Sequence, residues 1–164
     1  MRRKDREVTS LDTVREILDG AKVMHLGMTE GGAPYVLPLN YGYELKDGAL
    51  RFFFHSAGEG RKVRILEENP AVFAEVDCEL GLKGEGDDAC VYGYYFASVM
   101  GPGKTRLLTD ETEKMDALRA LMRQQTGRDG FTFRPETVAR VKVYEVKLDS
   151  FTAKMNPKPG HGGQ

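Results

Sequence analysis

The sequence predicts a mainly β fold of the α+β class, with about six antiparallel strands that close into a small barrel and with flanking helices. Three observations support this class. Runs of β-branched and aromatic residues recur along the 164-residue chain. Short segments that contain glycine join several of these runs, as tight turns between antiparallel strands do. Clear helical signals, by contrast, are confined to a few short segments.

The first third of the chain predicts one helix followed by three strands. Residues 11–20 follow a capping Thr9 or Ser10, carry an apolar stripe and end at Gly20, as a short amphipathic helix does. The apolar runs that follow predict strands over residues 22–29, 34–45 and 49–56. Because the connections EGGA and KDG are short, we expect these strands to form a three-strand antiparallel meander.

The middle of the chain predicts a second helix and two further strands. Residues 60–70 carry an apolar face and end at an Asn-Pro pair, which predicts a helix that stops there. Residues 71–80 alternate as a strand does, and residues 91–101 form another apolar run. The intervening residues 81–90 are polar and rich in glycine, so we expect a loop.

The last third predicts one long helix and one or two strands. Asp110 and Glu113 resemble a capping box, apolar residues then recur at helical spacing, and Gly127 closes the helix. Residues 138–148 alternate strictly, which predicts a strand, and residues 151–155 indicate a further short one.

The composition is that of an ordinary globular domain, with 40% hydrophobic and 30% charged residues. The net charge of -1 argues against general nucleic-acid binding. No apolar run reaches the roughly 18 residues of a membrane span, and no signal-peptide core follows the charged N-terminus. We therefore expect a cytoplasmic protein with no membrane partner. Residues 1–155 would form a single domain, and the Pro- and Gly-rich residues 156–164 a disordered tail.

Neither the cysteines nor the histidines have the spacing of metal ligands. Cys78 and Cys90 lie outside any CxxC motif, and a reducing compartment favours free thiols. His25, His55 and His161 are scattered along the chain. We therefore predict no metal site.

Two glycine-rich segments resemble phosphate-binding motifs without matching them. Residues 101–105, GPGKT, lack the first glycine of the Walker A pattern and the helix that should follow. We interpret them as a strand end with a hairpin turn. Residues 58–63, GEGRKV, carry Val63 where the dinucleotide fingerprint has its third glycine, and no βαβ unit surrounds them. A Rossmann fold is therefore not expected.

Residues 50–62, LRFFFHSAGEGRK, nonetheless predict an anion site. An apolar strand ends at His55 and Ser56, and a turn with two glycines leads to a helix whose first turn carries Arg61 and Lys62. Cations oppose the helix dipole at that end, whereas a bound phosphate would compensate them. The alternative is a solvated turn with two surface cations, but the start of a helix favours the anion site.

Two further segments carry polar residues on apolar strands. Pro38 forfeits a ladder hydrogen bond, and Asn40 and Tyr41 follow it in LPLNYGYE. This segment is either an edge strand with a polar outer face or a surface offered to a flat polar heterocycle. Ser98 lies within the apolar run YYFASVMG, where a serine bonded to the backbone is the common alternative to a ligand contact.

Together, MRRKDREV, LPLNYGYE, FFFHSAGEGRKVRILEENPAV and YFASVMGPGK resemble the pyridoxamine 5'-phosphate oxidase-like, FMN-binding split β-barrel proteins. The most similar branch is the nitroimidazole-resistance (Nim-like) group. The resemblance covers residues 1–155. It implies a six-stranded split barrel and a homodimer with FMN in the groove between the subunits.

The resemblance also implies roles for individual residues. Those beside the flavin ring would be Pro38, Asn40 and Tyr41. Those near the ribityl chain and the phosphate would be His55, Ser56, Arg61 and Lys62. A later strand would present Ser98 to the cofactor, and Lys154 and Asn156 would reach the site of the second subunit.

The activity that the resemblance implies is an FMN-dependent oxidoreductase. It would pass electrons from a reduced nicotinamide to a small oxidised acceptor such as a nitroaromatic. His55 is the candidate for proton delivery near the flavin. One alternative is a non-catalytic flavin- or haem-binding protein, a carrier or sensor, with His25 or His55 as the haem ligand. Pyridoxamine phosphate oxidation is less favoured, because the C-terminus does not match that branch.

Overall fold

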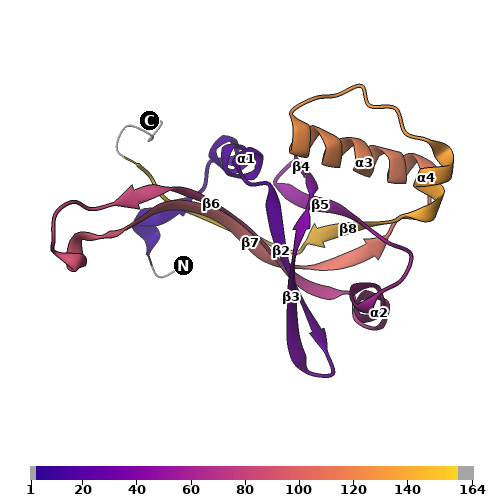
Figure 1. The fold of residues 1–164 in the computed structure, drawn as a ribbon, viewed down its shortest axis with the longest axis horizontal. Helices are drawn as coiled ribbons and strands as arrows, with labels where there is room; N and C mark the ends of the chain where they lie inside the picture. The colour runs from indigo at the N-terminus through magenta and orange to yellow at the C-terminus, as the bar shows by residue number, and fades with distance from the viewer. Residues whose placement is uncertain (1–2, 159–164) are drawn as a thin grey trace.

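One antiparallel sheet dominates the computed structural model, which describes residues 3–158 (Figure 1). Its strands are β1 (Glu7–Val8), β2 (Val23–Glu30), β3 (Ala33–Asn40), β4 (Gly42–Lys46), β5 (Ala49–Ser56), β6 (Ala71–Lys83), β7 (Gly93–Leu107), β8 (Lys142–Leu148) and β9 (Thr152–Asn156). Their order is β3-β2-β6-β7-β8-β5-β4, and β9 pairs with both β7 and β1. The predicted class, a mainly β split barrel with flanking helices, is confirmed, although the described residues form nine strands rather than six.

Four α-helices of the described residues flank this sheet (Figure 1). They are α1 (Leu11–Gly20), α2 (Arg61–Glu68), α3 (Glu111–Thr126) and α4 (Pro135–Arg140), and there are two short 3-10 helices, η1 (Lys4–Arg6) and η2 (Ala89–Val91). Local signals set the ends of the predicted helices: the Ser10 and Asp110 side chains cap α1 and α3, and left-handed Gly127 ends α3. No helix within residues 3–158 is long and apolar enough to cross a membrane.

The sheet stays open between its edge strands β3 and β4, which Tyr41 alone connects. The two antiparallel pairings of the predicted meander are observed, β2 with β3 and β4 with β5. The predicted middle strand 34–45, however, breaks at Tyr41, so the three strands do not form one continuous meander. The break occurs because the Tyr41 ring turns fully into the core, edge-on to Phe52. Its hydroxyl donates to the Leu18 carbonyl at 2.7 Å, near the end of α1.

We expect Tyr41→Phe to lower the free energy of unfolding by about 1 kcal/mol, the usual value of one hydrogen bond. The loss stays small because Gln124 Nε2 also donates to the Leu18 and Ala21 carbonyls, at 2.6 and 2.7 Å. Urea denaturation of Tyr41→Phe, Gln124→Leu and the double variant tests this. The loss in free energy of unfolding should be larger in the double variant than the sum of the losses in the two single variants. Only the double variant removes every side-chain donor from the Leu18 and Ala21 carbonyls. Additive costs would contradict the shared network.

β5 is buried on both of its faces, which explains the run of three phenylalanines. Phe52 and Phe54 point into the main core inside the barrel, whereas Phe53 joins a second core with α3. Successive side chains of a strand point to opposite faces, so a strand covered on both sides reads as a continuous apolar run. Figure 1 shows α3 lying across β4, β5 and β8.

β7 continues through residues 101–105, which the sequence predicted to be a strand end with a hairpin turn. The glycines serve close packing here. A Cβ atom on Gly101 would lie 2.1 Å from the Ser150 carbonyl oxygen, so only glycine lets that backbone approach. Residues 101–105 do not form a phosphate-binding loop, because the strand continues through them and no helix begins there.

Two other predicted boundaries also move. The strand expected over residues 138–148 begins at Lys142, because Pro135 starts the helix α4 at a position that suits proline. The loop expected over residues 81–90 is shorter, since β6 runs to Lys83 and pairs with β7 in a hairpin that projects from the barrel (Figure 1). Of the predicted tail 156–164, Asn156 ends β9, and residues 159–164 lie outside the described residues.

Candidate functional site

Four of the predicted cofactor residues share one face of the sheet. We call it the outer sheet face and define it as the side of β2, β3, β6, β7 and β9 that is turned away from the main core. Pro38 and Asn40 lie on it in β3, and Ser98 and Lys154 lie directly opposite each other in β7 and β9. Pro38 and Asn40 are exposed, whereas Ser98 is largely buried between its neighbours.

These four residues do not converge on one pocket within the chain. β3 and β7 are three strand spacings apart in the sheet. At about 4.8 Å per spacing, Asn40 and Ser98 are separated by about 14 Å. The outer sheet face is therefore a broad surface, on which a flat ligand could lie but which does not enclose one.

The predicted phosphate residues lie elsewhere, at the end of β5 and the start of α2. Ser56 is buried on the core side of β5 with Phe54, whereas His55 is exposed on the opposite side, across from Val143. His55 and Ser56 point to opposite faces because side chains alternate along a strand. A ligand on one side of the sheet can thus contact only one of the two.

The two predicted phosphate cations have different surroundings. Arg61 donates two hydrogen bonds to Glu30, at 2.6 and 2.9 Å, and stacks over the Tyr35 ring. Arg64 binds the same carboxylate and, together with Arg61, holds the pKa of Glu30 below its ordinary value. A phosphate would therefore compete with Glu30 for Arg61.

Lys62, by contrast, forms no ion pair with any residue in the described part of the chain. Its Nζ lies 5.5 Å from the centre of the Phe54 ring, and burial lowers the pKa of its amine. It belongs to the first turn of α2, and the N-cap residue Gly60 has no side chain to cap this helix start. Lys62 is therefore the available cation of this helix start.

Tyr41 and Asn40 are engaged with the protein itself. None of the Tyr41 side chain is exposed, so it offers no contact to a ligand on the outer sheet face, contrary to the role that the resemblance implied. Burial also raises the pKa of its hydroxyl. The Asn40 amide donates to the Lys22 carbonyl and to Gln125 Oε1, at 3.2 and 3.1 Å. Asn40 is nevertheless exposed, and it lies with Pro38 on the outer sheet face.

The fold also assembles a cluster that the sequence did not indicate. His25, Glu75 and Asp77 lie side by side on the outer sheet face, with His25 opposite both Pro38 and Glu75 in the register. His25 Nδ1 is 3.2 Å from Glu75 Oε2 and 3.8 Å from Asp77 Oδ1. The only sequence signal was the alternation of β6, which places residues 75 and 77 on one face.

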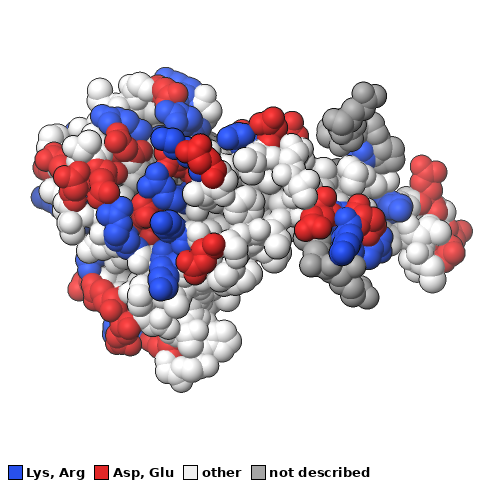
Figure 2. All heavy atoms as spheres, turned by 180° about the vertical axis from the view of Figure 1, so that it is seen from behind, with Lys and Arg blue, Asp and Glu red and all other residues white. Residues whose placement is uncertain are grey.

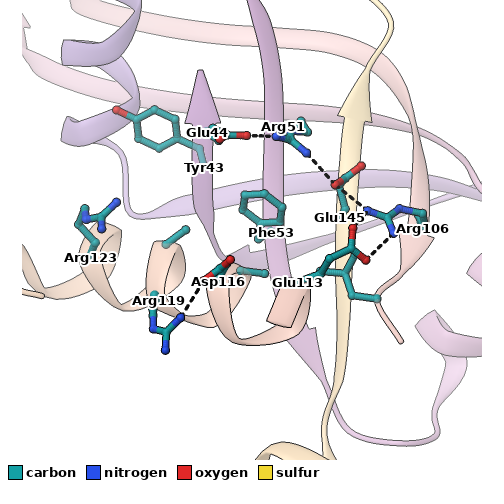
Figure 3. Close-up of a pocket in the computed structure, with 13 residues that line it drawn as sticks. Tyr43, Glu44, Arg51, Phe53, Arg106, Glu113, Asp116, Arg119, Arg123 and Glu145 are labelled. Carbon is teal, nitrogen blue, oxygen red and sulfur yellow. Dashed lines mark hydrogen bonds and ion pairs between the residues drawn. The ribbon is translucent and has the colours of Figure 1, made fainter. Parts of the chain in front are cut away.

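A cavity of about 420 Å³ lies between α3 and the sheet, and none of the predicted residues lines it (Figure 3). Its charges form a paired network. Arg51 and Arg106 both donate to the buried Glu145, at 3.4 and 3.1 Å, and each also pairs with a second carboxylate, Glu44 or Glu113. This pairing raises the pKa of Arg106 and lowers that of Glu113. We interpret the network as part of the contact between α3 and the sheet.

Charge gives no sign of a polyanion-binding surface on the face seen in Figure 2. Lysine and arginine alternate there with aspartate and glutamate over the body of the molecule, and uncharged residues occupy the band between the body and the projecting hairpin. A nucleic-acid site would need a broad basic patch.

A comparison with protein families identifies the family of this chain. The family model described as Pyridoxamine 5'-phosphate oxidase matches residues 10–155. The chain belongs to this family, and the resemblance predicted from its motifs is confirmed. No curated protein matches the chain.

Solved structures agree with this family. A candidate 5-nitroimidazole antibiotic resistance protein from Bacteroides thetaiotaomicron is 31% identical with a TM-score of 0.76, and the match covers 91% of this chain and 86% of that chain. The flavocytochrome Anf3 from Azotobacter vinelandii is 22% identical with a TM-score of 0.75, over 96% and 72% of the two chains. The FAD and heme binding protein from Mycobacterium smegmatis is 16% identical with a TM-score of 0.74, over 97% and 81%. The last two support the fold alone.

Proposed function

We propose that the protein binds FMN and passes electrons from a reduced nicotinamide to a small oxidised acceptor such as a nitroaromatic. The observation that carries this proposal is Lys62, a half-buried cation with no carboxylate partner among residues 3–158, at the start of α2. A flavin phosphate would supply the negative charge that this site lacks. Family membership and the similarity to flavoproteins support the same ligand.

Different residues would hold the phosphate and the ring of the ligand. Lys62 and the free N–H groups at the start of α2 would bind the phosphate, and Gly60 lets the backbone come close to it. Pro38, Asn40, Ser98 and Lys154 would border the ring on the outer sheet face. His55, exposed on its own side of β5, is the candidate for proton delivery. A bound flavin would supply the redox chemistry itself.

Two copies of the chain are needed for this arrangement. The phosphate residues and the outer sheet face are different surfaces of one chain, so a ligand that contacts both requires a second copy. The outer sheet face also exposes Val36 and Phe73, at 60% and 47% of their surface. Exposed apolar side chains on a sheet face favour burial against a partner. We therefore propose a homodimer that packs through this face.

Phe73→Glu is expected to convert the dimer to monomers, because it places a charge in the centre of the proposed contact. Light scattering at fixed protein concentration measures the mass of wild type and variant. Leu11→Glu is the matched control: Leu11 is also partly exposed, at 37%, but lies on α1 away from the outer sheet face. A Phe73→Glu protein that stays dimeric would place the contact elsewhere.

An absorption spectrum of the purified protein, with mass identification of any released chromophore, tests the proposed ligand. Flavin bands with the mass of FMN are the expected result, and the mass of FAD would correct the identity of the flavin. A colourless protein that also fails to bind added FMN would overturn the proposal.

The alternative is a flavin- or haem-binding protein without turnover, and the similarity to a flavocytochrome and to an FAD and heme binding protein favours it. A Soret band in the same spectrum would support haem. A bound flavin that neither NADH nor NADPH reduces would support a non-catalytic flavoprotein.

A further inference from the structure

The cluster of His25, Glu75 and Asp77 brings one imidazole and two carboxylates together on the outer sheet face. All three side chains come from the paired strands β2 and β6, with His25 directly opposite Glu75 and Asp77 two residues further along β6. Paired strands in the interior of a sheet hold their side chains at fixed spacing. The three groups are therefore placed together by rigid elements and not by a loop.

The two carboxylates of this cluster lack a permanent positive partner. Within residues 3–158, Glu75 and Asp77 pair with no lysine or arginine, whereas Glu30, Glu113 and Glu145 each bind arginine. Lys154 lies two strands from Asp77, and its Nζ sits over the Phe96 ring.

We propose that His25, Glu75 and Asp77 form a binding site for a divalent first-row transition metal ion of the zinc type. Two ligand atoms bound to one tetrahedral ion at about 2.0–2.1 Å are about 3.3–3.4 Å apart. The distances from His25 Nδ1 to the two carboxylate oxygens, 3.2 and 3.8 Å, lie on either side of that value. The two carboxylates lie within 4.8 Å of each other, and a cation between them would draw them together.

The ligand set decides the class of ion. An imidazole nitrogen with two carboxylates suits zinc, cobalt or manganese, whereas calcium and magnesium prefer oxygen ligands alone. Three protein ligands leave at least one coordination position open. The cluster lies beside Pro38, which is opposite His25 in the strand register. The site does not rest on the proposed flavin function, because its ligands, its charge and its test involve no flavin.

Titration of the EDTA-treated, flavin-free protein with zinc chloride, followed by calorimetry, tests the proposal. One ion per chain is expected. His25→Ala and Asp77→Asn should each weaken the binding at least about tenfold, because removal of a ligand costs more than loss of a residue behind one. His55→Ala is the matched control, since it removes another exposed strand histidine and keeps Cys78, Cys90 and His161 in place. It should bind zinc as the wild type does.

Cobalt serves as the spectroscopic probe of the ligand set. Oxygen and nitrogen ligands give only weak visible bands, whereas a strong thiolate band in the near ultraviolet would show that a cysteine binds the ion. Circular dichroism of both variants confirms that they fold, and Asp77→Asn keeps the shape of the side chain. Equal zinc affinity in the wild type, His25→Ala and Asp77→Asn would overturn the site. Absence of zinc binding by the folded wild type would overturn it as well.

Discussion

Lys62→Met is expected to weaken FMN binding by about 1–3 kcal/mol, the range for loss of a charge-assisted hydrogen bond. This corresponds to roughly a fivefold to 150-fold rise in Kd. Methionine keeps an unbranched chain over Phe54 and removes only the ammonium group, so the loss reports charge and not packing. Titration of the flavin-free protein with FMN, followed by quenching of flavin fluorescence, measures the affinity.

Lys104→Met is the control for this substitution, because Lys104 is an exposed lysine on β7 and is not part of the α2 start. It should leave FMN affinity unchanged. Arg61→Met should cost less than Lys62→Met, since Arg61 already pairs with Glu30. Unchanged affinity in Lys62→Met would refute the role of Lys62 in phosphate binding.

Lys62→Met should also change how the stability of the flavin-free protein depends on pH. Burial lowers the pKa of Lys62, so between its folded and its unfolded pKa the unfolded chain binds more protons than the folded chain. Below the folded pKa of Lys62, burial of its charge lowers the free energy of unfolding of the flavin-free wild type. This loss is recovered as the pH rises from the folded pKa towards 10.5. Lys62→Met should lack that alkaline gain. Urea denaturation at several alkaline pH values compares the two slopes.

Gly42→Ala is expected to lower the free energy of unfolding by about 3 kcal/mol or more, the upper range for overpacking. A Cβ atom on Gly42 would lie 2.2 Å from the Leu121 backbone nitrogen and 2.4 Å from the Ala120 carbonyl carbon. These are backbone atoms of α3, so no side chain can rotate away, and α3 would have to move off β4. The midpoint of urea denaturation, at a fixed protein concentration, measures the loss.

Gly93→Ala is the matched control, because it adds the same methyl group to a strand glycine with nothing within 4 Å of the new atom. Its effect should stay within about 0.5 kcal/mol, as for other surface substitutions. Equal stability of the two variants would contradict the close contact between α3 and β4.

The sequence predicted α1, α2 and α3, because their signals lie within a few residues of each other, but it missed α4. The Ser10 and Asp110 caps and the left-handed Gly127 act on neighbouring backbone groups, and each is where the pattern indicated. Strand pairing was harder to predict. The break at Tyr41 depends on a pocket that α1 and Gln124 build from distant parts of the chain, so alternation alone read residues 34–45 as one strand.

The candidate site also has some features that follow from local sequence and others that depend on the tertiary structure. Residues 55–62 predict an anion site by themselves, since strand, turn and helix start are consecutive in the chain. Only the tertiary structure decided that Glu30, 31 residues away, engages Arg61 and leaves Lys62 available. Likewise, His25 meets Glu75 across 50 residues of chain. The sequence determines which groups a segment offers, but charge pairing depends on distance in space, and that distance exists only once the sheet has formed.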